Sequence, residues 1–186
     1  MFRREELTTL SPERLPIVGV MGSGSAPHAA RAARLGTWLA EQGFHLLTGG
    51  GPGVMSSVSE AFWGVSGRRG LVIGIVPCVE GDPGRSRSGY PNPWVEVPIM
   101  THLPPSGENG TESMSRNHIN VLSSDVLVAL PGGSGTRSEL ELAVTYGRPV
   151  IAWVSASDEI PGLPPGVPQA EAFDQVAQFV LANAGR

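Results

Sequence analysis

Residues 131–139, which read Pro-Gly-Gly-Ser-Gly-Thr-Arg-Ser-Glu, constrain this chain more than any other stretch. An apolar run at residues 126–130 leads into them, and a helical pattern at residues 140–144 follows. A strand, a glycine loop and a helix start in this order direct unpaired backbone N–H groups and the positive end of a helix dipole at one point. Because phosphate is the usual occupant of such a point, the stretch predicts binding of a phosphorylated small molecule, with a nucleotide as the first candidate.

The order of apolar runs and helical patterns predicts the fold class. Continuous apolar runs indicate strands buried on both faces, and their alternation with helices indicates an α/β fold with a doubly wound parallel sheet. We expect a single domain over residues 1–186, with an N-terminal extension at 1–14 and a Pro-rich connection at 155–168 before the C-terminal helix. The predicted strands are 16–21, 45–48, 71–76, 94–98, 126–130 and 149–154. The predicted helices are 28–42, 111–123, 139–146 and 170–182, together with a helix that follows the glycine turn at 49–53 and ends at 65.

The absence of lysine excludes two classes of enzyme. All 13 basic residues are arginines, so the chain lacks the lysine of a P-loop NTPase and the Schiff-base lysine of a pyridoxal enzyme. Any bound phosphate has to be held by arginine, hydroxyl groups or backbone N–H groups. The four histidines show no metal-ligand spacing, and the single cysteine, Cys78, cannot form an intrachain disulfide. We therefore expect no metal, no resident cofactor and a reducing, cytoplasmic location.

Charge and hydropathy bear on the partners of the protein. The formal net charge of -4 gives no electrostatic footprint for nucleic acid, and no apolar run approaches the ~20 residues that span a membrane. The expected partner is a small phosphorylated ligand, either a nucleoside monophosphate or a pterin, rather than nucleic acid or a membrane. The segments 80–93 and 102–110 are expected to be surface loops or lids, with Arg85 or Arg87 within reach of an anion.

Two further glycine turns follow predicted strands, so they are expected at the same carboxyl edge of the sheet as residues 131–139. The first, at residues 22–25, lacks the third glycine of a dinucleotide fingerprint, which argues against NAD. The second, at residues 49–53, allows a ligand to approach the backbone closely. We expect Gly22, Ser23, Gly50 and Gly51 to line the side of the site that holds the base and the ribose.

Glu139 and Arg116 are the candidate charged residues of the site, and each has a structural alternative. Thr136 and Glu139 have the spacing of a capping box, which by itself would explain both side chains. On a helical wheel Arg116 shares a wedge with Ser113, Asn117, Asn120 and Ser124. This wedge either faces the ligand or is the wet face of an ordinary amphipathic helix.

Residues 131–139 resemble the P-G-G-x-G-T-x-x-E signature of the Lonely Guy (LOG) family. In that family's R-K-x-x-M motif the arginine precedes the signature glutamate by 23 positions, which is the interval between Arg116 and Glu139. The loop at 49–55 is also similar to the family's earlier glycine loop. The resemblance implies a Rossmann-like fold, a homodimer or higher homo-oligomer, and hydrolysis of the N-glycosidic bond of cytokinin nucleoside 5′-monophosphates.

The second motif departs from the family pattern, because it reads R-N-x-x-N, with Asn117 and Asn120 in place of lysine and methionine. This form is more similar to the related molybdenum cofactor carrier proteins, which bind a phosphorylated pterin. The leading hypothesis is a LOG-like hydrolase that splits a nucleoside 5′-monophosphate into free base and ribose 5-phosphate. The alternative is a non-catalytic carrier of molybdenum cofactor or another phosphorylated ligand, with a ligand-sensing module as a third class.

The leading hypothesis assigns a role to each candidate residue. Glu139 would stabilise an oxocarbenium-like transition state or orient the attacking water, and Arg116 would hold the phosphate or the ribose hydroxyls. Asn117 and Asn120 would contact the ligand beside Arg116. The phosphate would be held by backbone N–H and hydroxyl groups of Gly132, Gly133, Ser134, Gly135 and Thr136.

Overall fold

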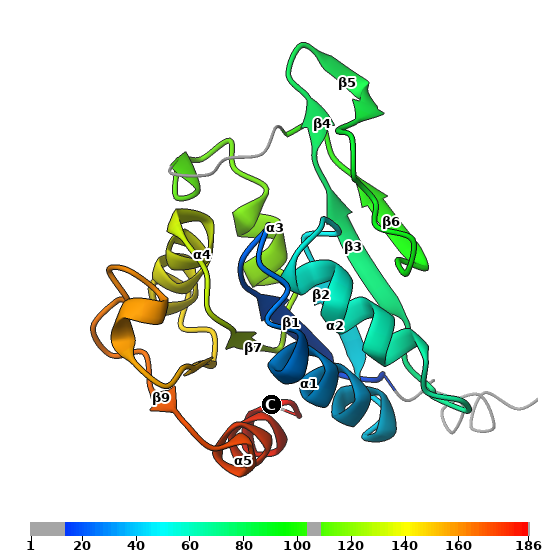
Figure 1. The fold of residues 1–186 in the computed structure, drawn as a ribbon. Coiled ribbons are helices and arrows are strands. Elements are labelled where there is room, and N and C mark those ends of the chain that lie inside the picture. Colours follow the sequence, from blue (N-terminus) through cyan, green and yellow to red (C-terminus); the bar gives the residue numbers. More distant parts are fainter. Residues whose placement is uncertain (1–13, 104–108, 186) are drawn as a thin grey trace, which may run out of the picture.

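The computed structural model describes residues 14–103 and 109–185, and its centre is a seven-stranded sheet in which all strands are parallel (Figure 1). The strand order is β6-β3-β2-β1-β7-β8-β9. This confirms the predicted single-domain, Rossmann-like α/β fold. The strands are β1 (Ile17–Met21), β2 (His45–Thr48), β3 (Val72–Val76), β6 (Val97–Met100), β7 (Val126–Ala129), β8 (Val150–Trp153) and β9 (Gln169–Ala170).

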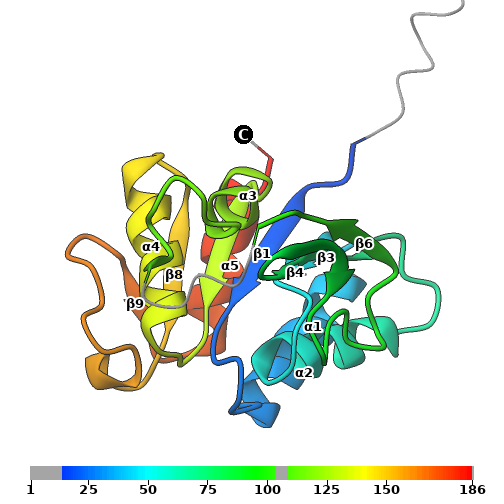
Figure 2. The ribbon, with the colours of Figure 1, turned by 90° about the horizontal axis from the view of Figure 1, so that it is seen from above.

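Helices cover both faces of the sheet, so the molecule has three layers (Figure 2). The core on one face joins the strands to α1 (Ala29–Glu41), α2 (Val54–Trp63) and α5 (Phe173–Asn183). The core on the other face joins them to α3 (Asn117–Leu122) and α4 (Ser134–Thr145). Neighbouring strand residues alternate between the two cores, which is why the central strands are apolar at nearly every position.

The order of the strands creates a switch point between β1 and β7. From β1 the chain builds outward through β2 and β3, and from β7 it builds outward in the opposite direction through β8. Ligands in open α/β sheets bind where the strand order reverses, outside the carboxyl ends of the strands. Here the loops after β1 and β7 meet, because the Ser23 N–H donates to the Pro131 carbonyl at 3.0 Å. The Ser23 carbonyl in turn accepts from the Val54 N–H at the start of α2, at 2.9 Å.

Two predicted helices begin at other residues than expected. The helix predicted at 139–146 begins at Ser134, since the Gly-Ser-Gly-Thr stretch winds into the first turn instead of remaining a loop. The helix predicted at 111–123 is confined to Asn117–Leu122 and is preceded by turns, so the wheel that placed Ser113 beside Arg116 was wrong. In both places glycine, serine and asparagine gave weak propensity, and tertiary contacts decided where the helix begins.

The other predicted elements differ less from the observed ones. The predicted loop at 80–93 contributes to a two-stranded antiparallel hairpin of β4 (Cys78–Val79) and β5 (Asp82–Ser86), which stands above the sheet in Figure 1. β6 lies a few residues later than the strand predicted at 94–98, and β9 falls where the last helix was expected to begin. The extension at 1–14 lies outside the described residues except for Arg14, as does the 104–108 part of the second loop.

The close contact between α1 and α2 yields a stability prediction. A Cβ atom added to Gly36 in α1 would overlap the Val58 carbonyl oxygen of α2 and lie 3.1 Å from the Phe62 nitrogen. Alanine should favour the helix by about 1 kcal/mol, but separating two packed backbones costs about 1–3 kcal/mol, so we expect Gly36→Ala to destabilise the protein. Urea denaturation measures the change. Gly64→Ala is the control, because its Cβ would meet the nearest atom at 3.4 Å, and equal stability of the two variants would contradict the close contact.

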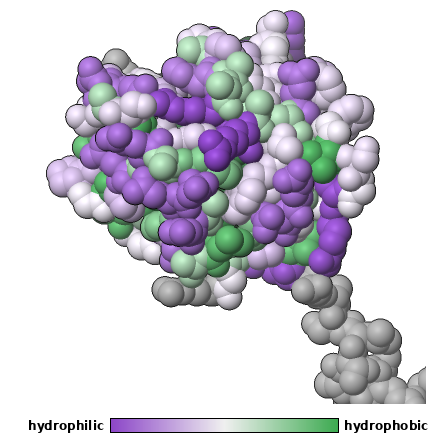
Figure 3. Space-filling view, turned by 60° about the horizontal axis from the view of Figure 1, so that its bottom comes forward, coloured by the Kyte–Doolittle hydropathy of each residue, from purple (hydrophilic) through white to green (hydrophobic). Residues whose placement is uncertain are grey.

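The surface is mixed in character. Figure 3 shows a face on which hydrophilic residues surround scattered apolar ones. In the part of the chain that the structure describes, none of the helices has the length and apolar character that crossing a membrane requires.

Candidate functional site

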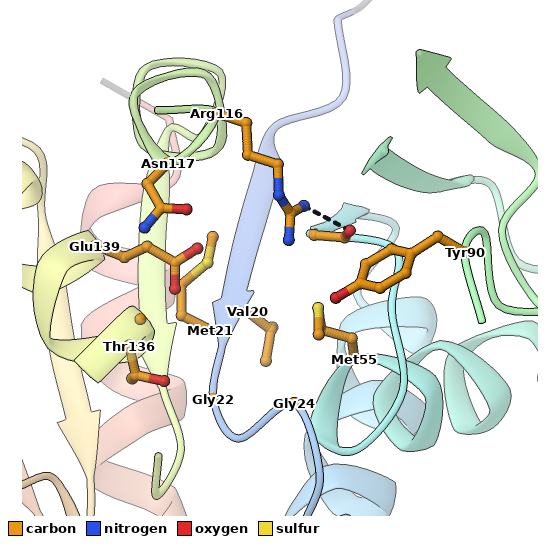
Figure 4. Close-up of a pocket in the computed structure, with 12 residues that line it drawn as sticks. Val20, Met21, Gly22, Gly24, Met55, Tyr90, Arg116, Asn117, Thr136 and Glu139 are labelled. Atoms are coloured by element: carbon orange, nitrogen blue, oxygen red, sulfur yellow. Dashed lines mark hydrogen bonds between the residues drawn. The ribbon is translucent and has the colours of Figure 1, made fainter. Parts of the chain in front are cut away.

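A pocket of about 210 Å³ lies beside the switch point of the sheet (Figure 4). The ends of β1 and β2, the start of α4 and the turn before α3 form its walls, so all three predicted glycine turns contribute to or adjoin it. Glu139, Thr136 and Met21 lie on one side of it, Met55 and Tyr90 lie on the other, and Arg116 reaches in between them. Its lining residues are Val20, Met21, Gly22, Gly24, Gly49, Met55, Tyr90, Arg116, Asn117, Gly135, Thr136 and Glu139.

A second cavity, of about 270 Å³, adjoins the pocket and shares Gly22, Gly24, Gly135 and Thr136 with it. The loop at 22–25 and the start of α4 form its walls. The first intrahelical bond of α4 runs from the Arg137 N–H to the Gly133 carbonyl, at 3.0 Å. The N–H groups of residues 134–136 therefore have no acceptor within the helix, and the positive end of the helix dipole faces this cavity. These are the features of an anion site.

Arg116 is a buried cation, only 7% exposed, at the N-terminal boundary of α3. Its Nη1 donates to the carbonyl oxygens of Gly49, at 2.7 Å, and Ile75, at 2.5 Å, which fixes the guanidinium at the ends of β2 and β3. Its Nε is buried without a hydrogen-bond partner among the described residues. Burial lowers the pKa of Arg116, whereas the neighbouring Tyr90 and Glu139 raise it. A guanidinium that lines a pocket with glycine walls is suited to an anionic or carbonyl oxygen.

Glu139 lies inside α4, six residues after its N-cap, and the predicted capping box is wrong. Because the helix begins at Ser134, Gly133 is the N-cap, and Thr136 sits in the first turn rather than before it. The Glu139 carboxylate accepts a hydrogen bond at 2.8 Å from the amide of Asn120, which is fully buried on α3. This tertiary contact, rather than a local cap, accounts for the position of the carboxyl group in the pocket.

Burial raises the pKa of Glu139 from its ordinary value of 4.5 to about 7. The hydrogen bond from Asn120 and the charge of Arg116 act in the opposite direction but do not offset the loss of solvation. Near neutral pH the group is therefore divided between the acid and the carboxylate. Such a group exchanges a proton readily when a ligand changes its surroundings.

The structure gathers most, but not all, of the predicted site residues. Gly22, Arg116, Asn117, Gly135, Thr136 and Glu139 line the pocket, and Ser23, Gly133 and Ser134 line the adjoining cavity. Gly132, Gly50, Gly51 and Asn120 line neither. Gly132 instead permits close packing, because a Cβ there would overlap Thr136 Oγ1, and Asn120 acts through Glu139.

Tyr90 and Met55 line the pocket although the sequence did not single them out. The Tyr90 ring lies 5.5 Å from the Arg116 guanidinium carbon, within range of a cation–π contact. It approaches so closely because Gly51 has no side chain, since a Cβ there would overlap the ring. The glycine run at 49–53 was the one available signal, but nothing in the sequence named the aromatic partner.

The sequence predicts no metal site anywhere in the chain. Within residues 14–103 and 109–185, no three histidine, cysteine, aspartate or glutamate side chains gather as a metal site would require.

Asn117 replaces the lysine of the LOG motif. Its side-chain amide donates to the Ser138 hydroxyl at 2.8 Å and so joins α3 to α4 beside the pocket.

Comparison with known proteins places this pocket in a family context. The model of the SLOG cluster4 family matches residues 15–172. An uncharacterized protein from Archaeoglobus fulgidus is 31% identical over 141 residues, which are 75% of this chain and 80% of that protein. The molybdenum cofactor binding protein of the phototrophic bacterium Rippkaea orientalis has a similar structure, with a TM-score of 0.71 and 32% identity over 91% of this chain and 98% of that one. For the molybdenum cofactor carrier protein of Chlamydomonas reinhardtii the TM-score is 0.65 and the identity 30%, over 90% and 99% of the two chains.

Proposed function

The chain belongs to the SLOG cluster4 family, and from that premise we propose that it is a non-catalytic carrier that binds the molybdenum cofactor, or another phosphorylated pterin, as cargo. The observation that carries this proposal is the buried Arg116, whose Nε lacks a partner and which lines a pocket continuous with the start of α4. The likeness to two molybdenum cofactor proteins at 30% identity or more supports the same reading.

The two cavities suit a ligand with a phosphate at one end and a ring at the other. The phosphate would take the N–H groups of Ser134, Gly135 and Thr136 in the adjoining cavity. The ring would occupy the pocket, with Arg116 and Glu139 at its edge and Met55 and Tyr90 on the side opposite Glu139. The shared glycines let the two parts of the ligand lie close to the backbone.

The proposal predicts one-to-one uptake of the molybdenum cofactor in an anaerobic titration. Removing the phosphate from the cofactor is expected to weaken binding on the order of 100-fold, because each charge-assisted hydrogen bond contributes about 1.5–3 kcal/mol. Loss of the cofactor's absorbance after gel filtration reports unbound cargo. Equal affinity for the intact and the dephosphorylated cofactor would overturn the phosphate site, and no uptake of the intact cofactor would overturn the proposal itself.

Hydrolysis of a nucleoside 5′-monophosphate is the second candidate function, and one observation favours it. Glu139, the glutamate of the LOG signature, lies in the pocket together with Arg116. A carboxylate that stabilises a ribosyl cation has to be ionised, whereas burial raises the pKa of Glu139 to about 7. We place the carrier first because two molybdenum cofactor proteins have similar structures and are at least 30% identical to this chain. Catalytic release of free base from AMP, GMP or IMP would reverse that order.

The homodimer expected from the family resemblance, the domain limits at 1–14 and 155–168 and the cytoplasmic location remain predictions. Light scattering of the purified protein would determine its oligomeric state.

A further inference from the structure

Two charged groups, the Arg116 guanidinium and the Glu139 carboxylate, line the pocket as a hydrogen-bond donor and an acceptor. Both groups are held in a fixed direction by their neighbours. Asn120 holds the Glu139 carboxylate from behind, at 2.8 Å, and the Gly49 and Ile75 carbonyls hold Nη1 of Arg116. Figure 4 shows the carboxylate and the guanidinium directed into the same pocket. A carboxylate has about four acceptor sites, so the contact with Asn120 leaves most of them for a ligand, and the Arg116 guanidinium lines the same pocket.

We propose that Glu139 and Arg116 read the edge of the ligand ring and select a 2-amino-4-oxopyrimidine, the ring of a pterin, over rings that lack the 2-amino group. Such an edge presents a carbonyl acceptor followed by two adjacent N–H donors. The carboxylate accepts both N–H groups, while the guanidinium donates to the carbonyl. This inference rests on the proposed function, because it names the ring that occupies the same pocket.

Other rings mismatch these two groups. A 2-oxo ring turns an oxygen toward the carboxylate, so one hydrogen bond is replaced by repulsion between two acceptors. An adenine edge presents one amino donor beside a ring acceptor, so it offers the carboxylate one N–H group instead of the two of a pterin. Met21, Met55 and Tyr90 line the pocket as well, and their polarizable and aromatic surfaces contact a ring whatever its edge. The edge therefore decides the selectivity.

The spacing along α4 fits a ligand of this kind. Gly133 and Glu139 are six residues apart on the helix, which at 1.5 Å per residue is about 9 Å. One ligand can place a phosphate at the helix start and a ring edge at Glu139, because Gly135, Thr136 and Glu139 line the same pocket. A compact bicyclic ring joined to a phosphate by a short linker spans such a distance.

Proton release should accompany binding of the matching ring. Glu139 has to be ionised to accept two N–H groups, and its pKa in the free protein is about 7. Among the described residues, the charged or titratable groups that face it are Arg116 and, through Arg116, Tyr90 and Arg87. Affinity should rise with pH up to about 7 and level off above it. The Glu139→Gln protein should lack this rise, since its side chain does not titrate.

The test compares 6-hydroxymethylpterin phosphate with the corresponding lumazine phosphate, which carries an oxygen in place of the 2-amino group. Fluorescence titration at pH 7.5 should give a dissociation constant at least about tenfold lower for the pterin, the loss expected for one hydrogen bond to a charged group. Glu139→Gln should reduce this preference to about threefold or less. Glu141→Gln is the matched control, because it removes the same charge from α4 at a side chain that is 41% exposed and paired with Arg137.

Each outcome bears on the inference. The inference is supported if the native protein and Glu141→Gln prefer the pterin phosphate tenfold and Glu139→Gln loses this preference. Equal affinity of the native protein for the two phosphates overturns ring selection by Glu139 and leaves the carrier proposal standing. A preference that survives in a Glu139→Gln protein with a native circular dichroism spectrum also overturns it. If neither pteridine binds, the inference fails, and cofactor uptake decides separately whether the carrier proposal fails with it.

Discussion

At pH 8 the Glu139→Gln protein is expected to be more stable than the native protein by about 3 kcal/mol. One pKa unit corresponds to about 1.4 kcal/mol, and burial moves the pKa of Glu139 from 4.5 to about 7. Glutamine is neutral, matches the shape of glutamate and can still accept the hydrogen bond from Asn120. The variant therefore keeps the native contact without carrying a buried charge.

The sign of the effect follows from proton linkage. A carboxyl group whose pKa is higher in the folded protein stabilises the fold fully below its unfolded pKa, and that stability is lost as pH rises toward the folded pKa. For Glu139 the loss runs from about pH 4.5 to about pH 7. We expect the two proteins to be equally stable at pH 4 and to diverge across this range.

Urea denaturation at several pH values measures this divergence. Glu141→Gln serves as the control, because its exposed carboxylate should give little difference between pH 4 and pH 8. Parallel stability curves for native and Glu139→Gln proteins over pH 4–8 would show that the carboxylate is not desolvated as the structure has it.

Replacing Arg116 by methionine is expected to weaken binding of the phosphorylated ligand by about 30-fold to several thousand-fold. Truncating one partner of a buried, hydrogen-bonded charge contact costs about 2–5 kcal/mol in binding, and Arg116 is the buried cation of this pocket. Methionine keeps a long unbranched side chain, so the packing between the ends of β2 and β3 is largely retained. Isothermal titration calorimetry with the cofactor measures the loss.

The same substitution should raise the pKa of Glu139, because the charge of Arg116 acts to lower it. The pH range over which stability is lost should then extend to higher values, which separates an electrostatic role from simple unfolding. Arg34→Met is the control, since Arg34 is an exposed cation on α1 that lies over the Phe173 ring. If Arg116→Met remains folded and binds the cofactor like the native protein, Arg116 does not contact the ligand.

The motif R-N-x-x-N shows how far the residues predict the site. Its arginine was recognised as a site residue, and the structure places it in the pocket. Its asparagines were expected to contact the ligand together, whereas Asn117 lines the pocket and Asn120 is wholly buried behind Glu139. Spacing within a short helix predicts the helix face on which each side chain lies. How deeply a side chain is buried depends on how closely the next helix packs against that face.

The capping box at Thr136 and Glu139 failed for a related reason. A capping box is a local pattern of four residues. It forms only if the first of these residues is the N-cap of the helix. The helix begins at Ser134 because the preceding loop is held from outside, by the Gly132 N–H donating to the Glu159 carbonyl at 3.0 Å and by the Ser23–Pro131 bond. Both contacts cross long stretches of sequence, so no local pattern reports them.

The sequence by itself determined the fold class and the edge of the sheet at which the ligand site lies. Apolar runs on both faces of each strand need helices on both sides, and glycine turns after parallel strands must gather at one edge. Only the tertiary structure decided that Glu139 is buried, paired with Asn120 and half-neutral near pH 7, and that Tyr90 lies over Arg116. The physical reason is that solvation and side-chain pairing depend on what packs against a residue, and for these residues the partners lie 19 to 26 positions away in the chain.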